Sequence, residues 1–225
     1  MPKTVVVVGA SRGIGAAVAQ HFHDKGDKVY AVSRTTAKAG EWIQADVSRS
    51  EGIAKISQVV GSQPLNALLF MGGVWEENAF TGEFDFSKSS DEETRFVLSV
   101  NLIAPIEVTK ALAENLTQAN NPRAIYIGAL SGLDHSASAE VANTASKFGL
   151  RGAIQALRVA LKQKGIGFTV INSGNVATDE VLSDIAEGRF SPQTPIPMSD
   201  MISAIEWIIS LSPSVDTGDV NLWQK

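Results

Sequence analysis

The chain has 225 residues, a formal net charge of −5 at pH 7 and 44% hydrophobic residues, enough for one large α/β domain over residues 1–225. It has no cysteine, which excludes disulfides and thiolate metal sites, and no Lys/Arg-rich run, which argues against nucleic acid as a partner. No apolar run is expected to span a bilayer and no signal peptide precedes the first strand, so we expect a cytoplasmic protein without a membrane partner.

A strand, a glycine-rich turn and a helix open the chain. Residues 4–15 read TVVVVGASRGIG, in which the β-branched run is typical of a buried parallel strand. Gly9, Gly13 and Gly15 form the turn at residues 9–15, where a pyrophosphate can approach the free N–H groups of the first helical turn. The helix that follows has an apolar face made of Ile14, Ala17, Val18 and Phe22. Together these parts predict a dinucleotide-binding element.

The second predicted strand, residues 28–32, ends at Ser33 and Arg34, where the adenosine ribose of a bound dinucleotide would lie. An acidic residue there would bind the ribose 2′-hydroxyl of NAD, whereas an arginine suits the 2′-phosphate of NADP. Arg34 and Arg12 could hold that phosphate from two sides, because guanidinium groups bind phosphate as bidentate forks. We therefore expect NADP(H) rather than NAD. The alternative is that both arginines are solvated surface residues.

The third predicted strand, residues 42–45, ends at Asp46 and Val47. Ser48 and Glu51 follow with the spacing of a capping box. We therefore expect Ser48 to cap the next helix and to be structural.

The fourth predicted strand, residues 65–70, is followed by Met71-Gly72-Gly73, whose small residues permit close approach to a cofactor. An irregular loop is expected over residues 74–89. Its aromatic residues are Trp75, Phe80, Phe84 and Phe86. They either line a substrate pocket or pack the loop onto the domain, and the sequence does not separate these alternatives.

A long helix is predicted from a second capping box, Ser90 and Glu93, to about residue 117. Pro105 lies inside it, and a proline ring clashes with the carbonyl four residues earlier, which belongs to Asn101. The helix should kink there and leave the Asn101 carbonyl free to hold a water. The alternative is a proline kink with no chemical role.

The second half of the chain continues the alternation of strands and helices. Strands are expected at residues 124–127, 168–171 and 219–223, and helices at residues 141–163 and 199–211. The irregular segment at residues 179–197 is expected to be a mobile lid over the substrate. This pattern predicts a single Rossmann-type doubly wound domain, with about seven parallel strands, helices on both faces and the cofactor at the carboxyl ends of the strands.

Three motifs occur in order along this chain. They are the glycine spacing G-x-x-x-G-x-G, the sequence NTASK at residues 143–147, and Gly174, Val176 and Thr178 after the strand at 168–171. They resemble the short-chain dehydrogenase/reductase family, which reads Tyr-x-x-x-Lys at the second place and Gly-x-Val-x-Thr at the third. The resemblance implies cofactor contacts from Gly9, Ser11, Arg12, Gly13, Ile14, Gly15, Ser33, Arg34, Asp46, Val47, Gly73, Lys147, Gly174, Val176 and Thr178.

The resemblance also implies a catalytic group of asparagine, serine, tyrosine and lysine. Asn101 and Lys147 match the asparagine that holds a proton-relay water and the lysine that the relay reaches. Ala129 stands where the family has the serine, and Asn143 stands where it has the tyrosine. An amide has no proton to give near neutral pH, so Asn143 can orient a carbonyl but cannot protonate an alkoxide. Carbonyl reduction by the tyrosine route is therefore expected to be absent or very slow.

Three hypotheses remain for the function. The first is an NADP-dependent reductase with another acid, which could be Lys147, a water held by Asn101, or His135. The second is a reductase of a substrate that needs no protonation where hydride arrives, such as an iminium or an activated alkene. The third is a non-catalytic NADPH-binding pseudoenzyme that acts as a sensor or as a structural or regulatory partner. By analogy with the family, we expect a homodimer or homotetramer formed through helices 91–117 and 141–163, and a small-molecule substrate or ligand.

Overall fold

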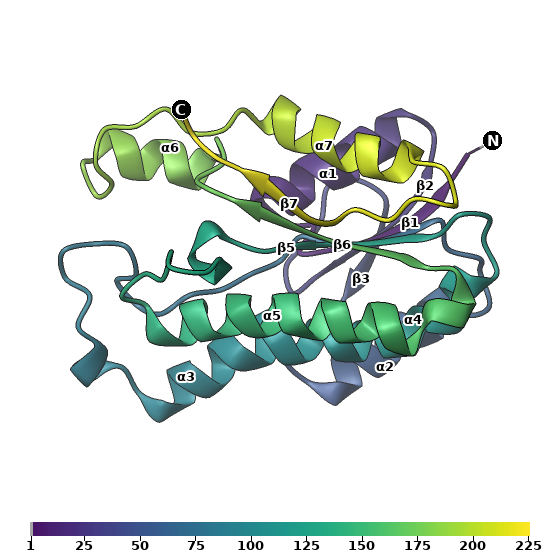
Figure 1. The fold of residues 1–225 in the computed structure, drawn as a ribbon, viewed down its shortest axis with the longest axis horizontal. Helices are drawn as coiled ribbons and strands as arrows, with labels where there is room; N and C mark the ends of the chain where they lie inside the picture. The colour runs from purple at the N-terminus through teal and green to yellow at the C-terminus, as the bar shows by residue number, and fades with distance from the viewer. Residues whose placement is uncertain (1) are drawn as a thin grey trace.

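Seven parallel strands form one sheet, in the order β3-β2-β1-β4-β5-β6-β7, in the computed structural model, which describes residues 2–225 (Figure 1). The strands are β1 (Thr4–Val8), β2 (Lys28–Ser33), β3 (Glu41–Gln44), β4 (Ala67–Phe70), β5 (Arg123–Ile127), β6 (Gly167–Ser173) and β7 (Gly218–Leu222). The predicted doubly wound seven-stranded sheet is confirmed. The strand order reverses between β1 and β4, and ligands of such sheets bind outside the carboxyl ends of the strands at that point.

Helices cover both faces of the sheet (Figure 1). They are α1 (Gly13–Asp24), α2 (Ser50–Val60), α3 (Asp91–Leu98), α4 (Ala104–Thr117), α5 (Val141–Ala160), α6 (Asp179–Ala186) and α7 (Met198–Ser210). Side chains of β1 alternate between two cores: Val6 and Val8 pack with α2, α4 and α5, whereas Val5 and Val7 pack with α1 and α7. A strand that is buried on both sides reads as a continuous apolar run, which is why the valines of β1 predicted it correctly.

Pro105 is accommodated by a change of helix type. The helix runs without a break over Asp91–Thr117, and its residues Ser99–Ile103 form a π-helical turn between α3 and α4. The wider turn separates the proline ring from the carbonyl of Asn101, so the predicted distortion takes the form of a π-bulge. This helix is long and apolar enough to cross a membrane, with a mean hydropathy of 1.5, contrary to the sequence expectation. Half of that stretch is buried within the domain, as in a core helix.

The first predicted capping box is wrong. The backbone N–H and the hydroxyl of Ser48 donate to Asp46 Oδ1, at 3.0 and 2.7 Å. Helix α2 begins two residues later, at Ser50, and Arg49 precedes it without a side-chain cap. Ser48 therefore closes a turn on Asp46. The carboxylate two residues earlier is a closer acceptor for the hydroxyl than any group of α2.

The second capping box forms only in one direction. Ser90 Oγ accepts from the N–H of Glu93 at 3.1 Å, as predicted. The carboxylate of Glu93 accepts instead from the N–H of Glu77 at 2.5 Å, which joins α3 to the loop after β4.

The segment at residues 179–197, which was expected to be irregular, begins with a helix. This helix, α6, has eight residues and is capped at its start by Thr178.

Candidate active site and cofactor cleft

A cleft of about 430 Å³ opens at the carboxyl ends of the strands and extends to α6. Sixteen of the residues named from the sequence line it: Gly9, Ser11, Arg12, Gly13, Ile14, Ser33, Arg34, Asp46, Val47, Gly73, Ala129, Asn143, Lys147, Gly174, Val176 and Thr178. Gly15 and Asn101 lie behind its wall. The sequence motifs, which are spread over most of the chain, therefore meet in one cavity.

Close backbone packing shapes the floor of this cleft. A Cβ atom on Gly15 would lie 2.1 Å from the carbonyl oxygen of Gly9, and one on Gly9 would lie 2.5 Å from the Cα of Gly72. Gly9 also has φ = +88°, which strains any side-chain-bearing residue. Gly9 is therefore required by its conformation and by contact with the backbone of Gly72, whereas a Cβ on Gly72 itself would meet nothing nearer than 3.3 Å.

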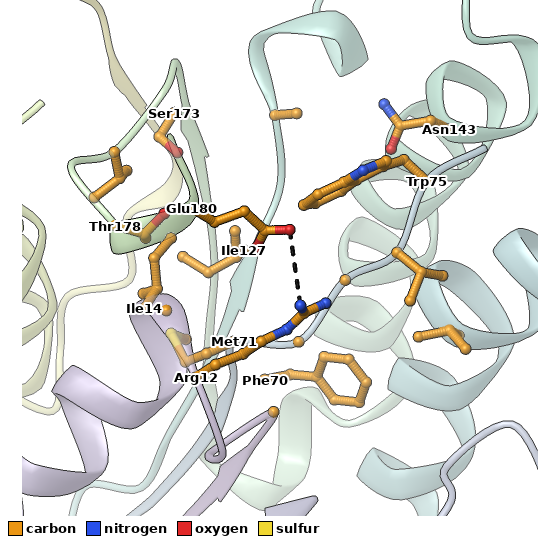
Figure 2. Close-up of a pocket in the computed structure, with 18 of the residues that line it drawn as sticks. Arg12, Ile14, Phe70, Met71, Trp75, Ile127, Asn143, Ser173, Thr178 and Glu180 are labelled. Carbon is orange, nitrogen blue, oxygen red and sulfur yellow. Dashed lines mark ion pairs between the residues drawn. The ribbon is translucent and has the colours of Figure 1, made fainter. Parts of the chain in front are cut away.

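The two arginines predicted to hold a 2′-phosphate both line the cleft, each beside a partner within the chain. Arg12 lies 3.7 Å from Glu180 of α6, across the cleft (Figure 2). Arg34 lies over the ring of Phe96, 5.8 Å from its centroid. The carboxyl of Asp46 accepts two hydrogen bonds from Ser48. Burial alone would raise the pKa of this carboxyl, but the hydrogen bonds from Ser48 and the nearby arginines have the larger effect and lower it. Asp46 is therefore ionised at neutral pH.

Lys147 lies at the centre of the cleft, on α5. Its ammonium donates to the carbonyl of Ile127, at the end of β5, at 3.1 Å. The side chain is buried, and burial lowers the pKa of its amine to about 8. Gly73 lies beside this amine: a Cβ there would be in van der Waals contact with Nζ, at 3.6 Å.

Neither of the two tyrosines in the chain reaches this cleft. Tyr126 is fully buried under the sheet, where its hydroxyl shares a 2.5 Å hydrogen bond with Thr109 and burial raises its pKa. Tyr30 is buried in the same core. No phenol therefore replaces the one that is missing at Asn143.

Asn101 ties the wall of the cleft together. Its side chain accepts from the N–H of Val74 at 2.9 Å and donates to the carbonyl of Val74 at 2.7 Å. It also donates to Ser146 Oγ at 3.2 Å. Asn101 thus joins the loop after β4 to the helix Asp91–Thr117 and to α5. The predicted water at the Asn101 carbonyl stays a prediction.

Asn143 is anchored through its backbone. Its N–H donates to the carboxylate of Glu76, at 3.2 and 3.3 Å, and its carbonyl accepts from Ser146 Oγ at 2.6 Å. Its side chain lines the cleft at the end where Trp75 lies (Figure 2). Within residues 2–225, the side-chain amide of Asn143 makes no hydrogen bond although the residue is only 3% exposed.

Two buried glutamates support this end of the cleft, and sequence reasoning missed both. Glu76 accepts from the N–H of Ala142 at 2.7 Å as well as from Asn143. Glu140 accepts from the N–H of Phe80 at 2.7 Å. No local motif marks either residue, because their partners are 60 or more positions away in sequence.

The aromatic residues of the loop at residues 74–89 divide between the two alternatives given above. Trp75 and Phe80 line the cleft, as expected for a substrate pocket, whereas Phe84 and Phe86 do not.

The strand end at β5 offers no hydroxyl at the expected place. Ala129 lines the cleft without a donor, and a Cβ on Gly128 would lie 2.2 Å from Asn172 Oδ1, which leaves no room for a serine there. Ser131 also lines the cleft, two residues further on. His135 lies outside the cleft lining and is exposed, so the structure does not bring it to Lys147.

Comparison with known proteins identifies the family of this chain. The family model described as "short chain dehydrogenase" matches residues 3–187. A 3-dehydrosphinganine reductase of Arabidopsis thaliana is 30% identical over 74% of this chain, and the chain spans 53% of that relative's length. A 3-oxoacyl-[acyl-carrier-protein] reductase of Escherichia coli is 26% identical over 86% of this chain and 82% of its own.

Solved structures show the same fold. A 4-hydroxyisoleucine dehydrogenase complexed with NADH superimposes with a TM-score of 0.79 at 25% identity, over 98% of this chain and 96% of its own. ElxO with NADP bound superimposes with a TM-score of 0.83 at 18% identity, over 99% and 97%. The chain has a Rossmann-type doubly wound fold. It belongs to the short-chain dehydrogenase family.

Proposed function

We propose that this chain is an NADP(H)-dependent oxidoreductase that acts on a small molecule without a tyrosine acid. One observation carries the proposal: Lys147 lines a glycine-floored cleft while both tyrosines lie buried elsewhere. The floor fits a dinucleotide, because Gly9, Gly13, Gly72 and Gly73 line it and glycine allows a phosphate to approach the backbone closely. When bound, a nicotinamide cofactor supplies or accepts a hydride. Gly13 and Ile14 at the start of α1 would hold its pyrophosphate, and Thr178 and Lys147 its nicotinamide half.

The preference for NADP(H) rests on charge at the end of β2. Arg34 lines the cleft there, at the position that would carry an acid for an unmodified ribose, and Arg12 lines the cleft from the turn before α1. Asp46 is engaged by Ser48. Similar structures contain NADH in one case and NADP in another, so the preference is argued from these arginines alone.

Lys147 is the group we propose to hold the proton. An amine with a pKa of about 8 is protonated at neutral pH and gives up its proton more easily than an ordinary lysine. The second route, a substrate that needs no protonation at the hydride-accepting carbon, uses Lys147 only to hold the cofactor. In both routes Asn143 orients the substrate and does not donate a proton to an alkoxide.

A second candidate function is a pseudoenzyme that binds NADPH without turnover. The observation that favours it is the loss of both substrate-polarising side chains, at Ala129 and Asn143.

For either function we propose a cytoplasmic homodimer or homotetramer. The apolar side chains Ile103 and Ile106, on the helix at Asp91–Thr117, and Val141 and Phe148, on α5, are more than a third exposed and could pair between subunits.

The test begins with binding. Titration with NADPH and NADH, followed by cofactor fluorescence, should give tighter binding of NADPH. Oxidation of NADPH is then followed with a panel of ketones, enones and cyclic imines. Turnover of imines or enones supports the reductase, binding without any turnover supports the pseudoenzyme, and failure to bind either cofactor overturns both.

A further inference from the structure

The side-chain amide of Asn143 is an unused recognition group. The residue is only 3% exposed and lines the cleft, and within residues 2–225 its amide has no hydrogen-bond partner. The amide is not among the side-chain groups that are sealed from solvent without a partner, so it faces the cleft, where a ligand can take the place of water. An asparagine side chain presents a donor and an acceptor side by side and can pair with a ring edge that offers the complementary two groups.

An aromatic wall stands at the same end of the cleft. Trp75 lines the cleft beside Asn143 (Figure 2) and is 47% exposed. Its ring meets that of Phe80 edge-on, with centroids 6.1 Å apart at 64°. Phe80 has φ = +64°, a strained value for a bulky residue. The hydrogen bond from its N–H to buried Glu140 holds that conformation. Strain held in this way at a cavity is typical of a binding site, and an exposed indole face suits a flat ligand.

The same end of the cleft disfavours a negative charge on the ligand. Glu76 already occupies the N-terminus of α5, accepting from Ala142 and Asn143. A ligand carboxylate beside Asn143 would therefore meet a carboxylate instead of a free helix end.

The lid is also balanced in charge. Its two acidic side chains in the cleft lining, Glu180 and Asp184, pair with Arg12 and Arg189. Phe190, which follows Arg189, adds another apolar side chain to the lining. Asp184 is neutralised by Arg189 and Glu76 repels an anion at the Asn143 end of the cleft, so an uncharged ligand fits best.

We propose that the substrate of this site is an uncharged flat ring that carries a cyclic amide, whose N–H and C=O pair with the amide of Asn143 while the ring lies against Trp75. This inference rests on the proposed function, because it names the substrate class of the same cleft. It assigns Asn143 and Trp75 to substrate recognition and leaves the cofactor to the glycine floor and Lys147.

The experiment measures binding by calorimetry, with and without saturating NADPH. The probes are 2-quinolone, which has the cyclic N–H and C=O, and N-methyl-2-quinolone, which lacks the N–H. Wild-type protein should bind 2-quinolone about tenfold more tightly than the N-methyl compound, since one hydrogen bond is lost and a buried acceptor is left unpaired. This comparison needs no variant.

Variants then assign the contacts. Asn143→Leu should reduce 2-quinolone affinity more than tenfold and remove most of the difference between the two compounds, since both hydrogen bonds to 2-quinolone are lost but only one to the N-methyl compound, whereas Trp75→Leu should weaken both compounds equally. Trp207→Leu, on the exposed side of α7, is the matched control and should change neither. An NADPH affinity equal to that of the wild-type protein shows that the cleft of a variant is folded.

The inference is overturned if 2-quinolone fails to bind, if it binds no better than its N-methyl analogue, or if Asn143→Leu leaves its affinity unchanged. These outcomes are separate from failure of the proposed function. If NADPH binds and the quinolones do not, only the substrate class is wrong; if NADPH itself does not bind, the proposed function is wrong.

Discussion

The carboxylate of Glu76 caps α5 from a position 67 residues before Asn143, whose N–H it accepts at 3.2 and 3.3 Å. The residue that precedes α5, Glu140, gives no side-chain cap of its own. Glu76 therefore satisfies N–H groups of the first helical turn and places a negative charge at the positive end of the helix.

Glu76→Ala should consequently lower the free energy of unfolding by about 1–3 kcal/mol, because buried N–H groups lose their acceptor. Glu76→Gln keeps an acceptor and should cost less. Urea unfolding measures both. Glu77→Ala, at the exposed neighbouring position, is the control and should have little effect. Equal losses for Glu76→Ala and Glu77→Ala would refute the capping role.

Gly15 and Gly152 make a matched pair of helical glycines. A Cβ on Gly15 would lie 2.1 Å from Gly9 O, a backbone atom that cannot move aside, whereas a Cβ on Gly152 meets nothing within 4 Å. Gly15→Ala should therefore prevent folding or abolish NADPH binding. Gly152→Ala should raise the free energy of unfolding by up to about 1 kcal/mol through helix propensity. Thermal unfolding and NADPH titration check both, and a stable Gly15→Ala variant with unchanged affinity would contradict the close packing.

Lys147 makes stability depend on pH in the alkaline range. Burial lowers the pKa of its amine to about 8 in the folded protein, from the ordinary 10.5. Below pH 8 both states carry the charge and the folded state bears the whole cost of burying it. Between pH 8 and 10.5 the unfolded chain binds more protons, so stability rises with pH by up to about 3 kcal/mol.

Lys147→Met removes this dependence. The difference in unfolding free energy between wild-type protein and the variant, measured in urea from pH 7 to 10.5, should shift in favour of the wild type as pH rises. Other titrating groups cancel in the difference. A flat difference would show that Lys147 is not buried as a free amine.

The backbone architecture could be predicted because local patterns determine it. The valines of β1 and the glycines after it mark a buried strand and a tight turn without reference to the rest of the chain. Glu76 and Glu140 could not be found, because what they bind is the start of a helix and a loop that only the tertiary fold brings near. The Ser48 prediction failed for a local reason: the capping-box spacing is present, but the carboxylate of Asp46, two residues earlier, accepts from the hydroxyl instead.

Restoring the missing catalytic side chains tests the scaffold. Asn143→Tyr with Ala129→Ser should create ketone reductase activity, since the phenol would lie on α5 one helical turn from Lys147, whose ammonium favours the phenolate. General acid help of this kind is typically worth about 10²–10⁴-fold. NADPH oxidation with a simple ketone measures it, and Gly128→Ser is a control that should fail because Asn172 fills the space. A double variant that binds NADPH yet stays inert would show that the pocket is not arranged as in the family.

The proposed preference for NADP(H) is tested at Arg34, which follows β2. Arg34→Gln should raise the Kd for NADPH about 10–100-fold, because a charge-assisted hydrogen bond to the 2′-phosphate is worth about 1.5–3 kcal/mol. Its Kd for NADH should change little, and Arg12→Gln should act in the same direction. Arg95→Gln is the matched control, since Arg95 pairs with Asp91 on the exposed face of α3. Equal losses for NADPH and NADH in Arg34→Gln would mean that the guanidinium packs the adenosine end of the cleft without reading the phosphate.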